Sequence, residues 1–157
     1  MQLRRIYLDS NVIIRAFEGS PTDEIAKDMV GMFGLIPSRS SQPFVTSHIT
    51  LAETLVHPIR DGATLAQQRY KLLLSGSSHW LHVRQISQSI LVEAARLRAT
   101  TSMKLPDAIH FATAIMTDCS HFLTSDTDFK FATSSGLPIA IRPTRQTLDD
   151  IIAWLRS

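Results

Sequence analysis

The chain has 157 residues, of which 44% are apolar and 19% charged, and its formal net charge is +2. These values predict one globular domain over residues 1–157 whose core needs no disulfide, and the single cysteine excludes an intramolecular one. No stretch approaches the roughly 18–20 apolar residues of a membrane span, and no signal peptide is visible, so we expect a cytoplasmic protein without a membrane partner.

The N-terminal half is predicted to alternate strands with helices. After Thr22, apolar residues recur at the spacing of one helix face, at Ile25, Met29 and Met32. In chain order, the predicted elements are a strand over Arg4–Leu8, a helix over Asn11–Phe17, a helix from about Thr22, a strand over Phe44–Thr46, a helix capped by Ser47 and limited by Pro58, and a helix over Thr64–Leu74.

The C-terminal half continues the alternation. Its predicted elements are a strand over Trp80–Ile86, a helix capped by Ser87, a helix over Asp107–Thr117 with Pro106 at its start, strands over His121–Thr124 and Ile139–Ile141, and a final helix opened by Thr147. Strands that alternate with helices favour an α/β fold, a three-layer sandwich whose mainly parallel central sheet is flanked by helices.

Two acids follow predicted strands directly. Asp9 ends the first strand, and Asp126 lies just after the strand over His121–Thr124. Open α/β sheets bind ligands at the carboxyl ends of their strands, so the two carboxylates converge if these strands are neighbours. Asp128 is a near alternative to Asp126, because an Asp-x-Asp pair at a strand end leaves the choice open.

Two further acids lie on predicted helices. Asp107 falls in the first turn of its helix, where the helix dipole favours a negative charge, and Glu53 borders an apolar helix face. Carboxylates brought together repel one another, and a divalent cation relieves that repulsion. Oxygen ligands suit Mg²⁺ or Mn²⁺ rather than zinc, and such a metal can activate water to attack a phosphodiester.

Each acid also has an ordinary interpretation, and spacing alone leaves both open. Asp9 could be a cap, Asp107 a partner of the helix dipole, Asp126 a turn residue and Glu53 a surface residue. His110 lies one helical turn from Asp107, where it is either a packed histidine or a residue that helps to seat an acid.

Four segments together resemble one known family. The segments are Tyr7–Ile14, Leu51–Glu53, Leu105–Ala114 and Phe122–Asp126, and each contains one of the acids. They are similar, in the same order, to the acidic motifs of PIN-domain nucleases. The likeness covers nearly the whole chain and is greatest to the VapC-type toxins of toxin–antitoxin pairs.

The resemblance implies an Mg²⁺- or Mn²⁺-dependent endoribonuclease that hydrolyses RNA phosphodiester bonds. Asp9 and Asp107 would be principal metal ligands, while Glu53 and Asp126 would complete the cluster and help to orient the attacking water. Asn11 and Thr124 would hydrogen-bond the acids beside them. The implied partners are an RNA substrate, a cognate antitoxin protein and a second copy of the chain in a homodimer.

Two other functions are considered. A non-catalytic PIN-like module that binds RNA or protein is the main alternative, and the presence of all four acids counts against it. A phosphatase with Asp9 as nucleophile would need a second acid two residues later, where the chain has Asn11.

Overall fold

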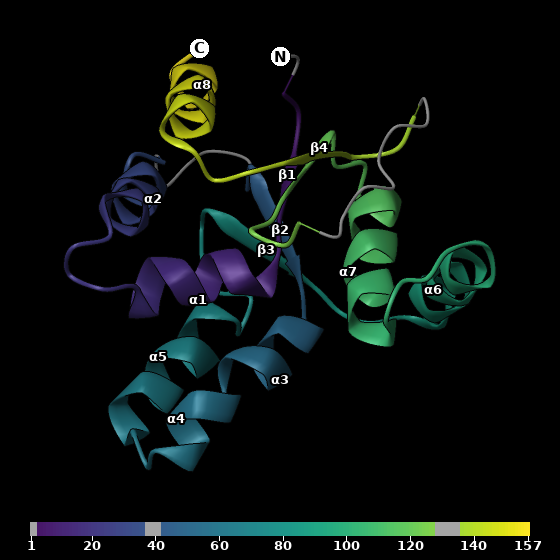
Figure 1. Cartoon of the computed structure of the whole chain (residues 1–157), viewed down its shortest axis with the longest axis horizontal. Helices are drawn as coiled ribbons and strands as arrows, with labels where there is room; N and C mark the ends of the chain where they lie inside the picture. The colour runs from purple at the N-terminus through teal and green to yellow at the C-terminus, as the bar shows by residue number, and fades with distance from the viewer. Residues whose placement is uncertain (1–2, 37–41, 128–135) are drawn as a thin grey trace.

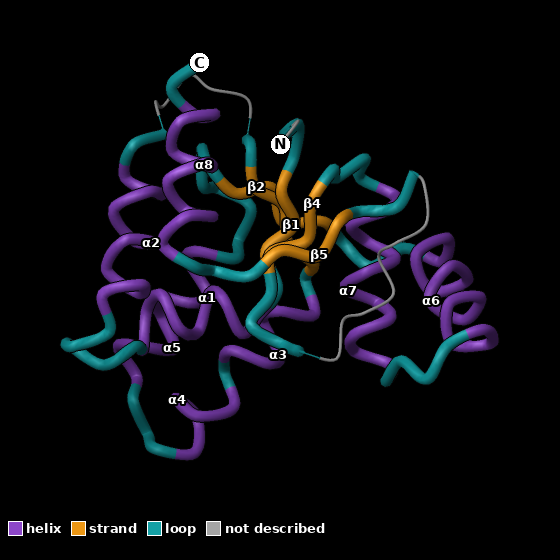
Figure 2. Tube along the Cα trace, turned by 45° about the horizontal axis from the view of Figure 1, so that its top comes forward, coloured by secondary structure: helices purple, strands orange, loops and turns teal. Residues whose placement is uncertain are grey.

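The computed structural model describes residues 3–36, 42–127 and 136–157. Five parallel strands form one sheet in the order β3-β2-β1-β4-β5, with helices on both faces (Figure 1, Figure 2). The predicted three-layer α/β fold is therefore confirmed. The strands are β1 (Ile6–Leu8), β2 (Phe44–Ser47), β3 (Leu81–Arg84), β4 (His121–Leu123) and β5 (Ile139–Ile141).

The helices divide between the two faces of the sheet. Figure 1 shows α1, α2 and α8 on one side of the strands and α6 and α7 on the other, with α3, α4 and α5 at one end. The helices are α1 (Ser10–Glu18), α2 (Glu24–Gly34), α3 (Ile49–Thr54), α4 (Val56–Arg60), α5 (Thr64–Leu73), α6 (Gln88–Thr100), α7 (Leu105–Met116) and α8 (Arg145–Leu155).

Strand alternation explains why there are two cores. Successive side chains of β1 point to opposite faces, so Ile6 and Leu8 pack with α1, α2 and α8, while Tyr7 packs with α6 and α7. All three residues are fully buried. Strands covered on both faces are expected to be continuously apolar, as β1 is.

The strand order places a topological switch at β1. From β1 the chain passes to β2 and then β3 on one side, and it returns to β4 and β5 on the other. Leu8 pairs with Leu123, and the Asp9 backbone N–H donates to the Leu123 carbonyl over 3.0 Å. The carboxyl ends of β1 and β4 are thus neighbours, at the crevice where open α/β sheets bind ligands.

Three predicted helix boundaries were wrong. Ser47 is the last residue of β2, and α3 begins at Ile49 without a side-chain cap. Pro58 lies inside the short helix α4, where it is tolerated because the first turn of a helix needs no N–H bonds. Thr144, not Thr147, caps α8, and its side chain accepts from the Thr147 N–H.

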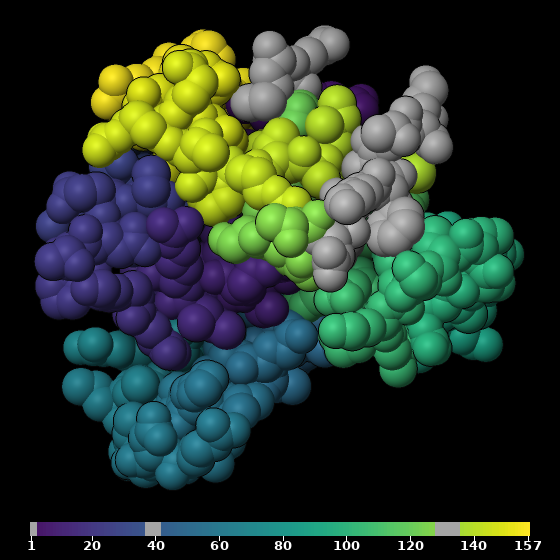
Figure 3. Space-filling model, in the orientation of Figure 1, coloured from purple at the N-terminus to yellow at the C-terminus, as the bar shows by residue number. Residues whose placement is uncertain are grey.

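The segment from α3 to α5 protrudes from the rest of the molecule, as the blue atoms at the lower edge of Figure 3 show. Its surface carries exposed apolar side chains, with Ile59 60%, Leu65 61% and Leu72 69% exposed. In the described parts of the chain, no helix has the length and apolarity needed to cross a membrane.

Candidate metal centre at the carboxyl edge of the sheet

Asp9 is buried at the end of β1, where only 5% of the residue is exposed. Its Oδ1 accepts the backbone N–H of Ser10 over 2.7 Å, so Asp9 also caps α1. Its Oδ2 accepts from Asn11 Nδ2 over 2.6 Å and from Thr124 Oγ1 over 2.7 Å. Oδ1 also accepts a longer hydrogen bond from Ser10 Oγ over 3.5 Å, so each carboxylate oxygen of Asp9 has two donors.

Asn11 and Thr124 join the ends of β1 and β4. Asn11 donates from Nδ2 to Thr124 Oγ1 over 3.1 Å, and its Oδ1 accepts the backbone N–H of Ser125 over 2.9 Å. Thr124 Oγ1 also accepts the backbone N–H of Asp126 over 3.0 Å. The two residues predicted to support the acids therefore touch Asp9 directly and fix the loop that carries Asp126.

The carboxylates of Asp9, Asp107 and Asp126 share one electrostatic environment. Burial raises the pKa of Asp9, although the nearby imidazole of His110 and the hydrogen bond from Thr124 act against it. Burial also raises the pKa of Asp107, and the negative charges of Asp9 and Asp126 raise it further. Lys104 and His110 offset this effect only in part. Asp107 is thus close enough to be affected by the charges of both Asp9 and Asp126, and Asp9 is affected in turn by the charge of Glu53.

Glu53, the fourth acid, is held by a histidine. Its Oε2 lies 2.7 Å from His110 Nε2, and that nitrogen is also 3.9 Å from Asp9 Oδ1. Burial would raise the pKa of Glu53, but the hydrogen bond from the nearby imidazole of His110 and a further hydrogen bond from Ser10 outweigh it and lower the pKa. His110 is 1% exposed and comes from the same helix as Asp107, so α7 supplies one acid and the partner of another.

The donor set fits a hard divalent cation. Carboxylate oxygens are the ligands that Mg²⁺ and Mn²⁺ prefer. Such a cation would also relieve the repulsion that Asp9 and Asp126 exert on Asp107. Across residues 3–36, 42–127 and 136–157, no three His, Cys, Asp or Glu side chains form a ready-made metal-binding group. Mg²⁺ keeps several of its waters and needs only one or two carboxylates, so a loose acidic cluster suits it. Asp128, the alternative to Asp126, lies outside the described residues.

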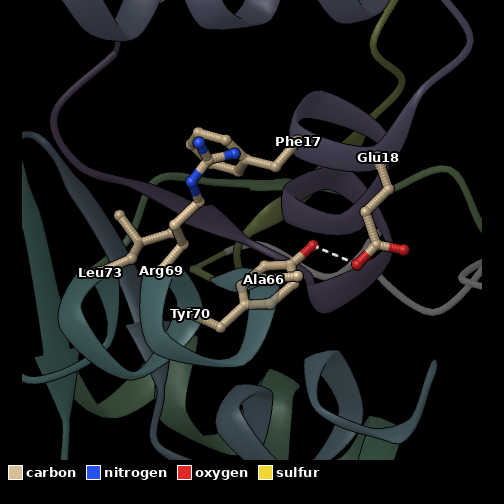
Figure 4. Close-up of a pocket in the computed structure, with 6 residues that line it drawn as sticks. All are labelled: Phe17, Glu18, Ala66, Arg69, Tyr70 and Leu73. Carbon is tan, nitrogen blue, oxygen red and sulfur yellow. Dashed lines mark hydrogen bonds between the residues drawn. The ribbon is translucent and has the colours of Figure 1, made fainter. Parts of the chain in front are cut away.

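A separate apolar groove of about 340 Å³ lies between α1 and α5 (Figure 4). Its walls contain Phe17, Tyr70 and Leu73, and the Tyr70 hydroxyl donates to Glu18 Oε1 over 2.7 Å. Phe17 is 48% exposed. Contiguous exposed apolar surface is typical of protein contacts. None of the four predicted acids lines the groove.

These features define a parallel α/β protein with a cluster of carboxylates at its topological switch point. The sequence profile of the PIN domain matches residues 6–133, a range that includes all four predicted acids. The chain belongs to the PIN domain family. Comparison with curated protein sequences gave no match.

Solved structures of similar fold come from toxin–antitoxin complexes. A chain of a toxin–antitoxin complex from Klebsiella pneumoniae is 27% identical, with a TM-score of 0.63, and the alignment covers 88% of this chain and 98% of that one. A chain of VapBC2 from Rickettsia felis, bound to a promoter DNA fragment, is 15% identical, with a TM-score of 0.59 and coverage of 87% and 97%. A chain of DNA-bound VapBC from Salmonella typhimurium is 15% identical, with a TM-score of 0.57 and coverage of 89% and 98%. At 15% identity the last two likenesses concern the fold alone.

Proposed function

We propose that residues 1–157 form a single nuclease domain that acts as a Mg²⁺- or Mn²⁺-dependent endoribonuclease, the toxin of a toxin–antitoxin pair in the cytoplasm. The observation that carries the proposal is the gathering of acids at the switch point of a PIN-domain sheet, where the charges of Asp9 and Asp126 act on Asp107. Carboxylates whose pKa is raised by burial and by neighbouring acids, as at Asp9 and Asp107, are typical of functional sites.

Each residue has a proposed role. Asp9 and Asp107 would hold the metal, with Asp126 and Glu53 completing the acidic cluster. The cation, once bound, supplies positive charge that activates water and stabilises the leaving oxygen of a phosphodiester. Asn11 and Thr124 keep Asp9 in one orientation through their hydrogen bonds to its Oδ2.

Asn11 also supports phosphodiester hydrolysis over an aspartyl-phosphate mechanism. Its amide donates to Asp9 and its carbonyl oxygen accepts from Ser125, so the side chain is fully used in holding the loop. An amide at this position has no acidic proton to give to a leaving group. The contacts of residue 11 therefore fit a support for Asp9 rather than an acid–base catalyst.

A protein partner is proposed for the α1–α5 groove. The chain that is 27% identical comes from a toxin–antitoxin complex, which supports an antitoxin as the occupant. The groove combines apolar walls with Arg69, which has no ion pair in the part of the chain that the structure describes. It fits a partner segment with apolar side chains and one carboxylate. We also propose a homodimer, which sedimentation equilibrium would test.

The function is tested with end-labelled total RNA and purified protein, in Mg²⁺, in Mn²⁺ and in EDTA. The matched variant is Asp107→Asn, which removes one charge and keeps the shape of the side chain. We expect metal-dependent fragments from the wild type alone. Fragments that persist in EDTA, or at full rate in the variant, would contradict the proposal. Metal binding without cleavage would instead support a non-catalytic module.

A further inference from the structure

Two hydrogen bonds link three polar side chains in a series from the core to the acidic cluster. The Tyr7 hydroxyl lies 2.7 Å from His110 Nδ1, and His110 Nε2 lies 2.7 Å from Glu53 Oε2. The Tyr7 and His110 rings also meet edge to face, with centroids 5.8 Å apart. Tyr7 is fully buried and His110 is 1% exposed, whereas the Glu53 side chain keeps 31% of its surface in solvent.

The partners decide which atoms donate. A carboxylate only accepts hydrogen bonds, so we assign the hydrogen of the bond to Glu53 to His110 Nε2. An imidazole with its hydrogen on Nε2 leaves Nδ1 as an acceptor, so the Tyr7 hydroxyl donates to Nδ1. The Tyr7 O–H therefore donates to His110 Nδ1, and His110 Nε2–H donates to Glu53.

We propose that His110 is a positioning residue for the nuclease, which holds the Glu53 carboxylate beside Asp9 and is itself held in one tautomer and orientation by Tyr7. This inference rests on the proposed function and extends it to residues that carry no acidic group. The 3.9 Å separation between His110 Nε2 and Asp9 Oδ1 places the imidazole at both acids at once. His110 thus holds an acid of α3 close to the acid that follows β1.

A purely structural role makes a different prediction. If Tyr7 and His110 only filled space between β1 and α7, apolar side chains of similar shape could replace both at little cost in stability. The series of hydrogen bonds instead ends on Glu53, a partly exposed carboxylate of the acidic cluster. A positioning residue must act through Glu53, so its effect must disappear when residue 53 can no longer accept the hydrogen bond from His110.

The test uses His110→Phe, which keeps a planar ring and removes both nitrogens, and His110→Gln, which keeps an N–H donor. RNA cleavage is measured as kcat and KM, and Mn²⁺ affinity by calorimetry without RNA. We expect His110→Phe to lower kcat and Mn²⁺ affinity by roughly 10–100-fold, as for other groups that orient metal ligands. We expect KM for RNA to change less than kcat, and His110→Gln to recover part of both losses.

Glu53→Leu provides the decisive background, because leucine cannot accept the hydrogen bond from His110. Adding His110→Phe to Glu53→Leu should cause no further loss of kcat or Mn²⁺ affinity, whereas a packing defect would add in full. In metal-free protein, ¹⁵N imidazole shifts should report the Nε2–H form of His110, and Tyr7→Phe should perturb them. Full kcat and Mn²⁺ affinity in folded His110→Phe, equal defects in the Gln and Phe variants, or an Nδ1–H tautomer would each overturn the proposal.

Failure of the proposed function remains distinguishable from failure of this inference. If the wild type binds Mn²⁺ but cleaves no RNA, the nuclease proposal is wrong. The Mn²⁺ affinities of the single and double variants then still decide whether His110 acts through Glu53. A wild type that binds no Mn²⁺ and cleaves no RNA would overturn both.

Discussion

Thr124 donates from Oγ1 to Asp9 Oδ2 over 2.7 Å, a contact between residues 115 positions apart. The bond ties the end of β4 to the end of β1 and, with Asn11, fixes the orientation of a buried carboxylate. The threonine is therefore expected to matter for metal binding although its hydroxyl is not one of the proposed ligands.

Thr124→Val tests that expectation because it replaces one hydroxyl by a methyl group. We expect Mg²⁺ affinity to fall by roughly 10–100-fold, since Asp9 loses a donor that orients it. Isothermal titration calorimetry measures the change. Thr117→Val is the matched control: Thr117 is also buried, but its hydroxyl donates to the Thr113 carbonyl oxygen at the end of α7. Equal losses in the two variants would contradict a specific role for Thr124.

Asp107→Asn should stabilise the metal-free protein at pH 7. Its pKa is raised from 3.8 by burial and then by the charges of Asp9 and Asp126, so the ionised side chain opposes folding. Solvent screens this partly exposed group, and we expect a gain of roughly 0.5–1 kcal/mol in the free energy of unfolding, measured in urea.

The pH dependence of that gain has a definite sign. The folded protein holds the Asp107 proton more tightly than the unfolded chain, so wild-type stability falls relative to the variant as the pH rises through the raised pKa. The advantage of Asp107→Asn should be absent below about pH 4 and complete at pH 7. Saturating Mg²⁺ should then stabilise the wild type more than the variant. A pH-independent difference would argue against charge repulsion as its cause.

Gly19 and Gly31 should respond oppositely to alanine. A Cβ at Gly19 would lie 2.4 Å from the Arg15 carbonyl oxygen and 2.7 Å from the Ala26 Cβ, so α1 and α2 would have to move apart. We expect Gly19→Ala to cost about 1–3 kcal/mol. Gly31 lies within α2 with nothing inside 4 Å of the added atom, so Gly31→Ala should gain up to about 1 kcal/mol. Urea unfolding of both variants checks the pair, and destabilisation by Gly31→Ala would be the contrary result.

Cys119 should be chemically inert in the folded protein. Burial raises the pKa of its thiol to about 11, and only 6% of the residue is exposed. The reactive thiolate is therefore scarce at neutral pH. We expect iodoacetamide to label Cys119 at a rate set by unfolding, faster by orders of magnitude in denaturing urea. Rapid labelling of the native protein would show that α7 and β4 open locally.

The sequence predicted the sheet and the positions of the acids because both depend on short-range patterns. Apolar runs such as Tyr7–Leu8 ending on Asp9 identify a buried strand and its carboxyl end without knowledge of its neighbours. The prediction that Asp9 and Asp126 converge required their two strands to be neighbours. The order β3-β2-β1-β4-β5 meets this condition, since it places β4 beside β1. The roles of the acids in metal binding and catalysis remain predictions.

The partners of the acids were harder to predict. The link from Tyr7 through His110 to Glu53 joins β1, α7 and α3, and no spacing along the chain reveals it. The only signal was the position of His110 one helical turn after Asp107, which is equally typical of a packed histidine. The cap of α8 was missed for a related reason: Thr144 and Thr147 both suit a helix start, and the sequence does not say which one the chain uses.

The place of β4 in the sheet has a consequence for synthesis of the protein. The nascent chain presents Asp9 early, but the partner strand and Thr124 leave the ribosome 115 residues later. At roughly 5–20 residues per second, this delay is on the order of 10 s. During that interval the N-terminal part of the chain lacks the hydrogen bond from Thr124 to Asp9, and it lacks Asp107 and Asp126. A ribosome that translates this protein therefore finishes most of the chain before the acidic cluster is assembled.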